Sequence, residues 1–263
     1  MKVPPCQTQP GAPAVETRGL TRCFNGFVAV DRLNLVVPRG QFFGFLGPNG
    51  AGKTTTLRML TGLLAPTQGT VRVLGYDMNN PAQARAAKRR MGVLPDPLAL
   101  FDHLTGREHL LLAGGMHGLD RSEAGARADE LLARLDLHPA AEQLVLEYSH
   151  GMKKKLALAM ALMGQPEVLF LDEPFEGVDP VLSRGIRDLL RRFVERGGTV
   201  FLTSHVLEIV EKLCSHVAII VEGRLQLQGS LEELRREGSL EERFLALSGR
   251  SLAEGPDLSW WRD

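Results

Sequence analysis

The first third of the chain combines segments of strand-like pattern with one segment of helical spacing. Residues 15–24 are rich in β-forming side chains, and residues 27–37 alternate apolar and polar positions, as strands with one buried face do. The next signals are a brief apolar strand at 41–46 that enters a glycine-rich stretch, helical spacing at 53–64, and a further strand at 70–74. This part is therefore predicted to hold several strands around a single helix.

A stretch of almost wholly helical signals follows, from about residue 97 to residue 151. Within it, Thr105 and Glu108 have the spacing of a capping box, in which a hydroxyl and a carboxylate each satisfy a free amide at a helix start. Two more boxes, at 230–233 and 239–242, predict short helices near the end of the chain.

Strand signals return after the helical stretch. Residues 168–171 and 199–203 are continuous apolar or β-branched runs, which is typical of parallel strands covered on both faces. Residues 217–221 and 224–228 predict a hairpin that turns at Glu222 and Gly223. We find no internal repeat. The pattern predicts an α/β protein divided into a disordered lead-in (1–14), a main domain (15–235) with a helical subdomain at about 97–155, and a C-terminal helix and tail (236–263).

Composition narrows the class of protein. The 263 residues are 44% hydrophobic, enough for a substantial core, and 31 basic residues balance 31 acidic ones. This neutral balance gives no support to a broad nucleic-acid interface, so no nucleic-acid partner is expected. Three scattered cysteines, Cys6, Cys23 and Cys214, favour a reduced cytosolic protein with buried thiols.

The sequence carries no sign of membrane insertion. Its N-terminus has prolines and no apolar core of a signal peptide. No apolar run approaches the roughly 18 residues needed to span a bilayer. If the protein works at a membrane, another molecule must hold it there.

The glycine-rich stretch fits the phosphate-binding pattern G-x-x-x-x-G-K-[ST]. Its glycines let successive backbone amides face a phosphate chain, Lys53 supplies a charge to the outer phosphates, and the Thr54 hydroxyl can bind Mg²⁺. It also follows a predicted strand and opens a predicted helix, as this mechanism requires. The nucleotide-binding residues are therefore predicted to be Gly47, Pro48, Asn49, Gly50, Ala51, Gly52, Lys53, Thr54 and Thr55.

Acidic side chains and a histidine follow two other predicted strands. Asp172 and Glu173 stand at the carboxyl end of an apolar strand, where open α/β sheets bind ligands. Asp172 is expected to hold Mg²⁺, and Glu173 to polarise the attacking water; the alternative is a simple helix cap. His205 follows the next such strand and is expected to hydrogen-bond the γ-phosphate, although a lone histidine there can also be a core or capping residue.

The stretch EYSHGMKKKLALAM, residues 147–160, raises a separate question. Small polar residues before an apolar helix indicate a cap, but the free amides of a helix start can also hold an anion. Lys153 to Lys155 are interpreted for the most part as a solvated helix face. Local pattern alone does not decide between the two roles.

Together these motifs resemble the nucleotide-binding subunit of ATP-binding-cassette (ABC) transporters, over residues 15 to about 249. The resemblance implies a P-loop NTPase (RecA-like) core, an N-terminal antiparallel β-subdomain and an inserted α-helical subdomain. The family signature Leu-Ser-Gly-Gly-Gln, which binds the γ-phosphate of ATP held by the partner subunit, corresponds to residues 148–152. Ser149 and Gly151 are then donors to that phosphate. His150 and Met152 depart from the pattern, which implies a weakened signature.

The same resemblance implies roles at four further positions. Phe24 would stack on adenine, although it can also be an ordinary core residue, and Asp179 would link the two ATP sites. Phe175 replaces the usual small hydroxyl residue, with no mechanism evident. Asp96 stands where the family has a glutamine that touches Mg²⁺ and relays to the membrane partner, so a carboxylate is expected to keep that contact with altered strength. Residues 239–249 resemble the closing segment of exporter-type subunits.

The implied function is that of a cytosolic ATPase at the inner face of the cell membrane. It would bind ATP and Mg²⁺, dimerise with an identical or paralogous subunit, and drive a separate transmembrane permease through residues 97–116, for export. A soluble ABC ATPase of repair, cofactor assembly or translation is the alternative; such relatives usually carry a coiled-coil insertion or a duplicated cassette, which this sequence lacks. A P-loop kinase or GTPase would leave the signature and His205 unexplained. The transported substrate is not encoded in these motifs.

Overall fold

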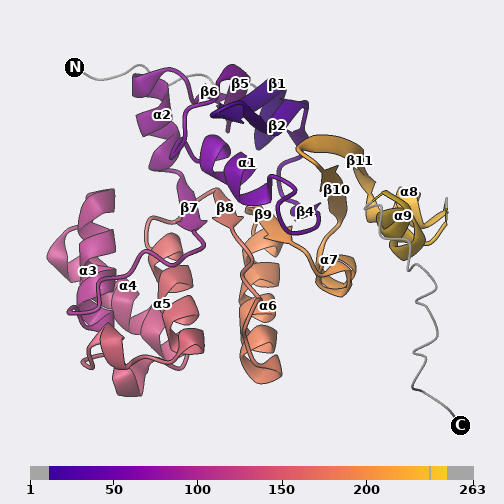
Figure 1. Cartoon of the computed structure of the whole chain (residues 1–263). Helices are drawn as coiled ribbons and strands as arrows, with labels where there is room; N and C mark the ends of the chain where they lie inside the picture. Colours follow the sequence, from indigo (N-terminus) through magenta and orange to yellow (C-terminus); the bar gives the residue numbers. More distant parts are fainter. Residues whose placement is uncertain (1–11, 237, 248–263) are drawn as a thin grey trace, which may run out of the picture.

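The computed structural model describes residues 12–236 and 238–247, and two sheets organise them (Figure 1). The smaller sheet has the strand order β2-β1-β5-β6, with β3 paired to β1, and its pairings are antiparallel. Its strands are β1 (Val15–Phe24), β2 (Phe27–Leu33), β3 (Val36–Val37), β5 (Gln68–Val73) and β6 (Tyr76–Asp77). This sheet is the antiparallel β-subdomain that the family resemblance implied.

The larger sheet has six strands in the order β11-β10-β4-β9-β8-β7. Only the hairpin partner β11 runs antiparallel to its neighbour; the other pairings are parallel. Its strands are β4 (Phe42–Leu46), β7 (Met91–Leu94), β8 (Val168–Leu171), β9 (Thr199–Ser204), β10 (His216–Val221) and β11 (Arg224–Ser230). Because β4, β9 and β8 are neighbours, the loops that follow them share one edge of the sheet.

Both faces of the larger sheet are buried, which explains the continuous apolar runs. Phe43 and Phe45 of β4 point into a cluster with α1 (Lys53–Leu60) and the smaller sheet. Phe42 and Leu46 of the same strand point the other way. They meet a second cluster built with α5 (His150–Leu162), α6 (Pro180–Glu195) and α7 (Leu207–Leu213). This alternation in space is the period-2 geometry of a strand with no solvent-facing side.

A third cluster holds the helical part of the chain together, at the left of Figure 1. It joins α3 (Gly106–His117), α4 (Arg121–Arg134) and one side of α5, with two short 3₁₀ turns, η1 (His138–Ala140) and η2 (Val145–Glu147), between them. Thr105 and Glu108 form the predicted capping box at the start of α3. Helix α5 serves two clusters and therefore ties the helical part to the larger sheet.

Several sequence predictions are confirmed. Strand 15–24 and strand 168–171 have the predicted bounds, and the hairpin of β10 and β11 turns at Glu222 and Gly223, both at positive φ. The hydroxyl of Ser230 accepts from the amide of Glu233 at 3.2 Å before α8 (Leu231–Arg236). The amide of Glu242 lies 3.4 Å from the Ser239 hydroxyl at the start of α9 (Leu240–Leu247).

Other predictions are wrong at their edges. The strand predicted at 27–37 divides into β2, which ends at Leu33, and the short β3. Arg32, at φ 48°, lies at an irregularity in the pairing of β2 with β1. The helix predicted at 53–64 ends at Leu60, followed by Gly62 at φ 65°. Residues 97–105 are not helical. The predicted lead-in, residues 1–14, is ordered at its end, since the amide of Ala14 donates to Val37 O at 2.8 Å and Ala14 is fully buried. Residues 1–11 and the tail from 248 lie outside the described residues.

One region gave no prediction at all. Residues 76–94 contain β6, α2 (Pro81–Lys88) and β7. A signal for α2 was present, since Asn80 caps it and Pro81 occupies its first turn. Within residues 12–236 and 238–247, no helix has both the length and the apolar character needed to cross a membrane.

Candidate functional site

The glycine-rich loop joins β4 to α1 and leaves its backbone open to a ligand. Gly50 adopts φ 80° and Gly52, the residue that precedes the helix, φ 99°; both values suit glycine. A Cβ on Gly52 would lie 2.5 Å from Ala29 O, so no larger residue fits there. The turn of the β10–β11 hairpin supports the loop from behind, where Gly223 N donates to Ala51 O at 3.0 Å.

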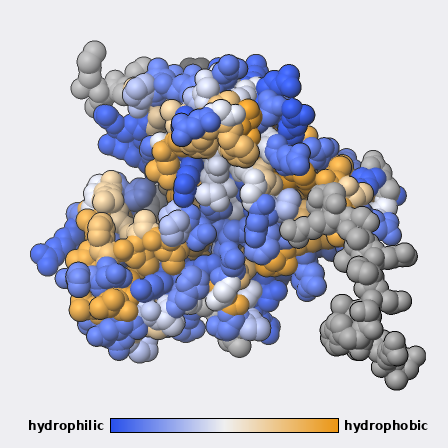
Figure 2. Space-filling model, in the orientation of Figure 1, coloured by the Kyte–Doolittle hydropathy of each residue, from blue (hydrophilic) through white to orange (hydrophobic). Residues whose placement is uncertain are grey.

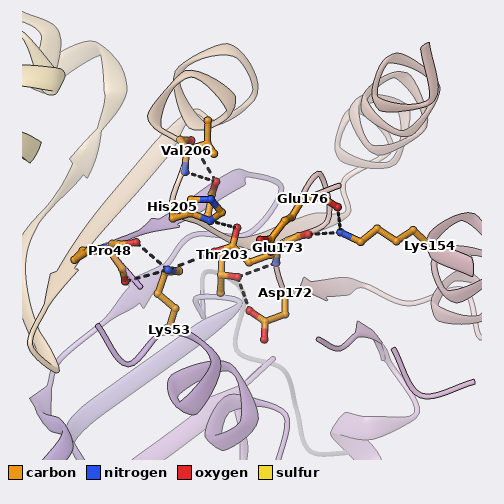
Figure 3. Close-up of polar contacts among 11 residues, drawn as sticks. Pro48, Lys53, Lys154, Asp172, Glu173, Glu176, Thr203, His205 and Val206 are labelled. Atoms are coloured by element: carbon orange, nitrogen blue, oxygen red, sulfur yellow. Dashed lines mark hydrogen bonds and ion pairs between the residues drawn. The ribbon is translucent and has the colours of Figure 1, made fainter. Parts of the chain in front are cut away.

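Lys53 lies buried at the mouth of this loop (Figure 3). Its ammonium donates to Gly47 O at 2.8 Å and to Pro48 O at 3.2 Å. It also lies 3.3 Å from Glu173 Oε1, and both side chains are nearly buried. The lysine charge is therefore satisfied by two carbonyls of the loop and by the carboxylate.

Asp172 lies at the end of β8 and is held by two hydroxyls. Thr203 Oγ1 of β9 donates to Asp172 Oδ1 at 2.6 Å, and Thr54 also forms a hydrogen bond with this carboxylate. Burial raises the pKa of Asp172 despite these hydrogen bonds. A desolvated carboxylate beside a threonine hydroxyl is a set of hard oxygen ligands, so the residues present fit Mg²⁺.

Glu173 stands one residue further, between the loop and the end of β9. Its backbone adopts φ 45°, and its amide donates to Thr203 Oγ1 at 3.0 Å. Its Oε2 lies 3.1 Å from His205 Nδ1, although that nitrogen has no aligned hydrogen bond among the described residues. Ligand atoms of Glu173, Glu176 and His205 lie within 4.8 Å of one another. The structure thus brings together Lys53, Asp172, Glu173 and His205, as predicted.

The start of α5 answers part of the question raised by residues 147–160. Ser149 caps the helix, its Oγ accepting from Met152 N at 3.2 Å. Capping leaves the hydroxyl at the helix end, where it remains exposed. Ser149, Gly151 and Asp179 line one cavity of about 290 Å³. The start of α5 is therefore a cap that also borders this cavity. It lies far along the sequence from the phosphate-binding loop of the same chain.

Phe24, Asp96 and Phe175 each have different surroundings in the structure. Phe24 is 40% exposed, with the Arg22 guanidinium 4.4 Å from its ring centroid, so it is not a core residue. The side chain of Asp96 is exposed; its main-chain carbonyl accepts from Arg58 at 3.3 Å, and its charge contributes to raising the pKa of Asp172. Phe175 is buried in the cluster of α5, α6 and α7, which gives it a packing role.

Two residues of the site were missed in the sequence. Thr203 holds both Asp172 and Glu173, and nothing in the strand pattern distinguishes it from its neighbours. Lys154 is buried and donates to Glu173 O at 2.9 Å, so the solvated-face interpretation is wrong for it. Helical spacing offered a signal, because Lys154 shares a face with the buried residues Ala157, Leu158 and Ala161.

Comparison with known proteins gives the site its context. The family model described as "ABC transporter" matches residues 30–176. The daunorubicin/doxorubicin resistance ATP-binding protein DrrA of Streptomyces peucetius is 39% identical over 252 residues, which are 95% of this chain and 76% of that protein.

Solved structures agree. The structure described as the ATP-binding subunit of an ABC transporter superposes with a TM-score of 0.82 and 28% identity, over 89% of this chain and 99% of the other. A dimeric ATP-binding cassette in a post-hydrolysis state, bound to ADP and Pi, superposes with a TM-score of 0.76 at 24% identity, over 82% of this chain and 98% of the other. The chain therefore belongs to the ABC transporter family, as one of its ATP-binding and ATP-hydrolysing subunits.

Proposed function

We propose that this chain is the motor subunit of an exporter. It closes on ATP with a second subunit, identical or paralogous, and drives a separate permease. The contact network that joins Lys53, Glu173 and His205 beside Asp172 carries the proposal, because it gathers a phosphate-binding cation, a base and a hydrogen-bonding histidine at one edge of the sheet (Figure 3).

In the proposed mechanism Lys53 and the loop amides bind the β- and γ-phosphates. Glu173 accepts the proton of the attacking water, and His205, 3.1 Å from its carboxylate, contacts the γ-phosphate. Thr54, Asp172 and Asp96 would hold Mg²⁺, which neutralises phosphate charge when it is bound. The adenine would stack on Phe24, whose exposed ring supports this role.

The second ATP contact is proposed to lie across a dimer. The Ser149 hydroxyl and the Gly151 amide stand at the positive end of α5 and open onto the same cavity as Asp179. A phosphate held by the partner chain would enter there. His150 adds an exposed side chain at this end, where the family pattern has glycine.

Apolar surface on the helical side supports a permease partner. A groove of about 390 Å³ with mainly apolar walls runs between the end of α1, β7 and α5. Leu63 lines this groove, and Phe101 and, on α3, Met116 are further exposed apolar side chains. Figure 2 shows apolar side chains over the helical part of the chain. Docking there would hold the chain at the inner face of the cell membrane. Export is supported by the resistance role in the name of the DrrA relative.

The domain division stays a proposal as well. A main domain over 15–235 with its helical subdomain at about 97–155 is supported by the separate third cluster around α3, α4 and α5. The segment from 236 onward would be a C-terminal helix and tail.

The test is co-purification of Glu173→Gln with ATP and Mg²⁺ from the native membrane fraction. A multi-helix membrane protein should be recovered with the variant and lost when Lys53→Ala replaces it. Recovery of an ATP-dependent dimer without any membrane protein would refute the transporter role and favour a soluble ABC ATPase.

A further inference from the structure

Three consecutive lysines on α5 have three different surroundings. The side chains of Lys153 and Lys155 are partly exposed and lie 3.6 Å from Asp102 and 4.0 Å from Asp136. Lys154 is only 3% exposed. Its ammonium donates to two main-chain carbonyls, Glu173 O at 2.9 Å and Glu176 O (Figure 3). Lys154 therefore binds main-chain carbonyls, whereas Lys153 and Lys155 lie near carboxylates.

The two carbonyls belong to the turn that follows the proposed base. Glu176 N donates to Glu173 O at 3.2 Å, which closes the turn. Glu173 itself sits at φ 45°, a conformation that a non-glycine residue keeps only when its surroundings enforce it. Thr203 binds the amide on one side of this residue, and Lys154 binds the carbonyl on the other. Together they fix the direction in which the Glu173 side chain leaves the backbone.

Filling space does not by itself explain a lysine at this position. Burial lowers the pKa of Lys154, while the carboxylates of Glu176, Asp96 and Glu173 act in the opposite direction. A methionine would fill a similar volume without the desolvation cost of an ammonium group. The distinctive property of the lysine is its donors, and the two carbonyls use them.

The same helix touches the loop beyond the turn. A Cβ on Gly177 would lie 3.3 Å from the ring of His150, so the first turn of α5 is in close contact with that loop. Lys154 is one turn further along. Helix α5 thus contacts the segment after Glu173 at two levels.

We propose that Lys154 is a positioning residue that couples the two ATP sites of the dimer. It links the helix whose end receives the partner's phosphate to the turn that aims Glu173 at the ATP of its own chain. The inference rests on the proposed function, in which Ser149 contacts the partner's phosphate and Glu173 is the base. Phosphate docking at one site then sets the geometry of the base at the other.

The test replaces Lys154 with methionine in the full chain and measures ATP turnover and ATP affinity. The kcat should fall about 10- to 100-fold, as expected when a reacting group is slightly misplaced, while KM and ATP affinity stay within about twofold. Lys154→Arg, which keeps several donors, should recover most of the rate. Lys153→Met is the matched control on the same helix and should turn over like the wild type.

A double variant separates positioning from other roles. In a Glu173→Gln background, Lys154→Met should lower the residual rate by less than twofold, because the group that Lys154 aims is already gone. A full additional loss there, or a Lys154→Met kcat equal to that of Lys153→Met, would overturn the inference. Wild-type turnover in Glu173→Gln alone would instead refute the proposed function. If Lys154→Met does not fold, Lys154→Gln, which keeps one donor, takes its place with the same criteria.

Amide hydrogen exchange tests the coupling itself. Adding ATP to the wild type should slow exchange over residues 173–179, and Lys154→Met should abolish most of this response while it still binds ATP. An equal response in both proteins would show that α5 does not act on the turn through this lysine.

Discussion

Replacing Glu173 with glutamine removes one negative charge from the centre of the site. The carboxylate lies 3.3 Å from Lys53 Nζ and 3.1 Å from His205 Nδ1, and its side chain is 12% exposed. The amide keeps the size of the side chain but cannot accept a proton from water. We expect ATP hydrolysis to slow about 100-fold or more, the usual effect of a positioned base, which corresponds to about 2.7 kcal/mol of barrier.

The same substitution should tighten ATP binding, because Lys53 loses its competing partner. Two unit charges 3.3 Å apart attract by about 5 kcal/mol at an effective dielectric constant of about 20. Desolvation of two nearly buried groups offsets most of that gain. If about 1 to 2 kcal/mol of net attraction remains, its loss strengthens ATP affinity about 5- to 30-fold.

The assay pairs phosphate release with equilibrium ATP titration on the same purified chains. Glu208→Gln is the control, since that carboxylate is exposed on α7 and pairs with Lys212 at 3.3 Å. The control should match the wild type in both measurements. Turnover of Glu173→Gln at the wild-type rate would refute the role of the base, and unchanged ATP affinity would refute the competition for Lys53.

Three further substitutions test the neighbouring groups. Lys53→Ala should abolish measurable ATP binding in the same titration, because no other side chain is predicted to bring a positive charge to the outer phosphates. Asp172→Asn should raise the thermal unfolding midpoint of the nucleotide-free and Mg²⁺-free protein at neutral pH, since it removes a buried charge. Burial raises the folded-state pKa of Asp172, so the wild type loses stability as pH rises from the unfolded-state pKa through the folded-state pKa. The difference in midpoint between Asp172→Asn and the wild type should therefore close as pH falls toward about 4. Asp96→Gln should alter the Mg²⁺ concentration needed for half-maximal turnover, and an unchanged Mg²⁺ titration and rate would remove Asp96 from the proposed metal ligands.

The sequence was sufficient to predict which side chains gather at the candidate site, because local signals marked each of them. Lys53 belongs to a spaced glycine pattern, and Asp172 and His205 each follow an apolar strand. Parallel strands bring their carboxyl ends to one edge, so residues far apart in the chain meet. What the sequence could not supply was the order β4-β9-β8, which makes β9 the central strand and places Thr203 between the two acidic residues.

The failures have local physical causes. Alternation predicted one strand as far as residue 37, whereas β2 ends at Leu33, just after an irregularity in its pairing where Arg32 has positive φ. The lysine run was interpreted for the most part as a solvated face, without saying which lysine departs from it; helical geometry separates adjacent residues by about 100° and places Lys154 inward. Its partners are backbone carbonyls, and such groups leave no mark in a side-chain pattern.

The ion pair between Lys53 and Glu173 joins the predicted phosphate-binding group to the predicted base. Lys53 is predicted to bind phosphate, and Glu173 to act on the water beside that phosphate, and the two charged groups lie 3.3 Å apart. One ammonium group cannot fully serve a carboxylate and a triphosphate at once. A phosphate that binds Lys53 therefore weakens the attraction between Lys53 and Glu173, which leaves the carboxylate better able to accept a proton from water. Under these roles, one ammonium group interacts with both the substrate and the base, which links ATP binding to catalytic competence without any further element.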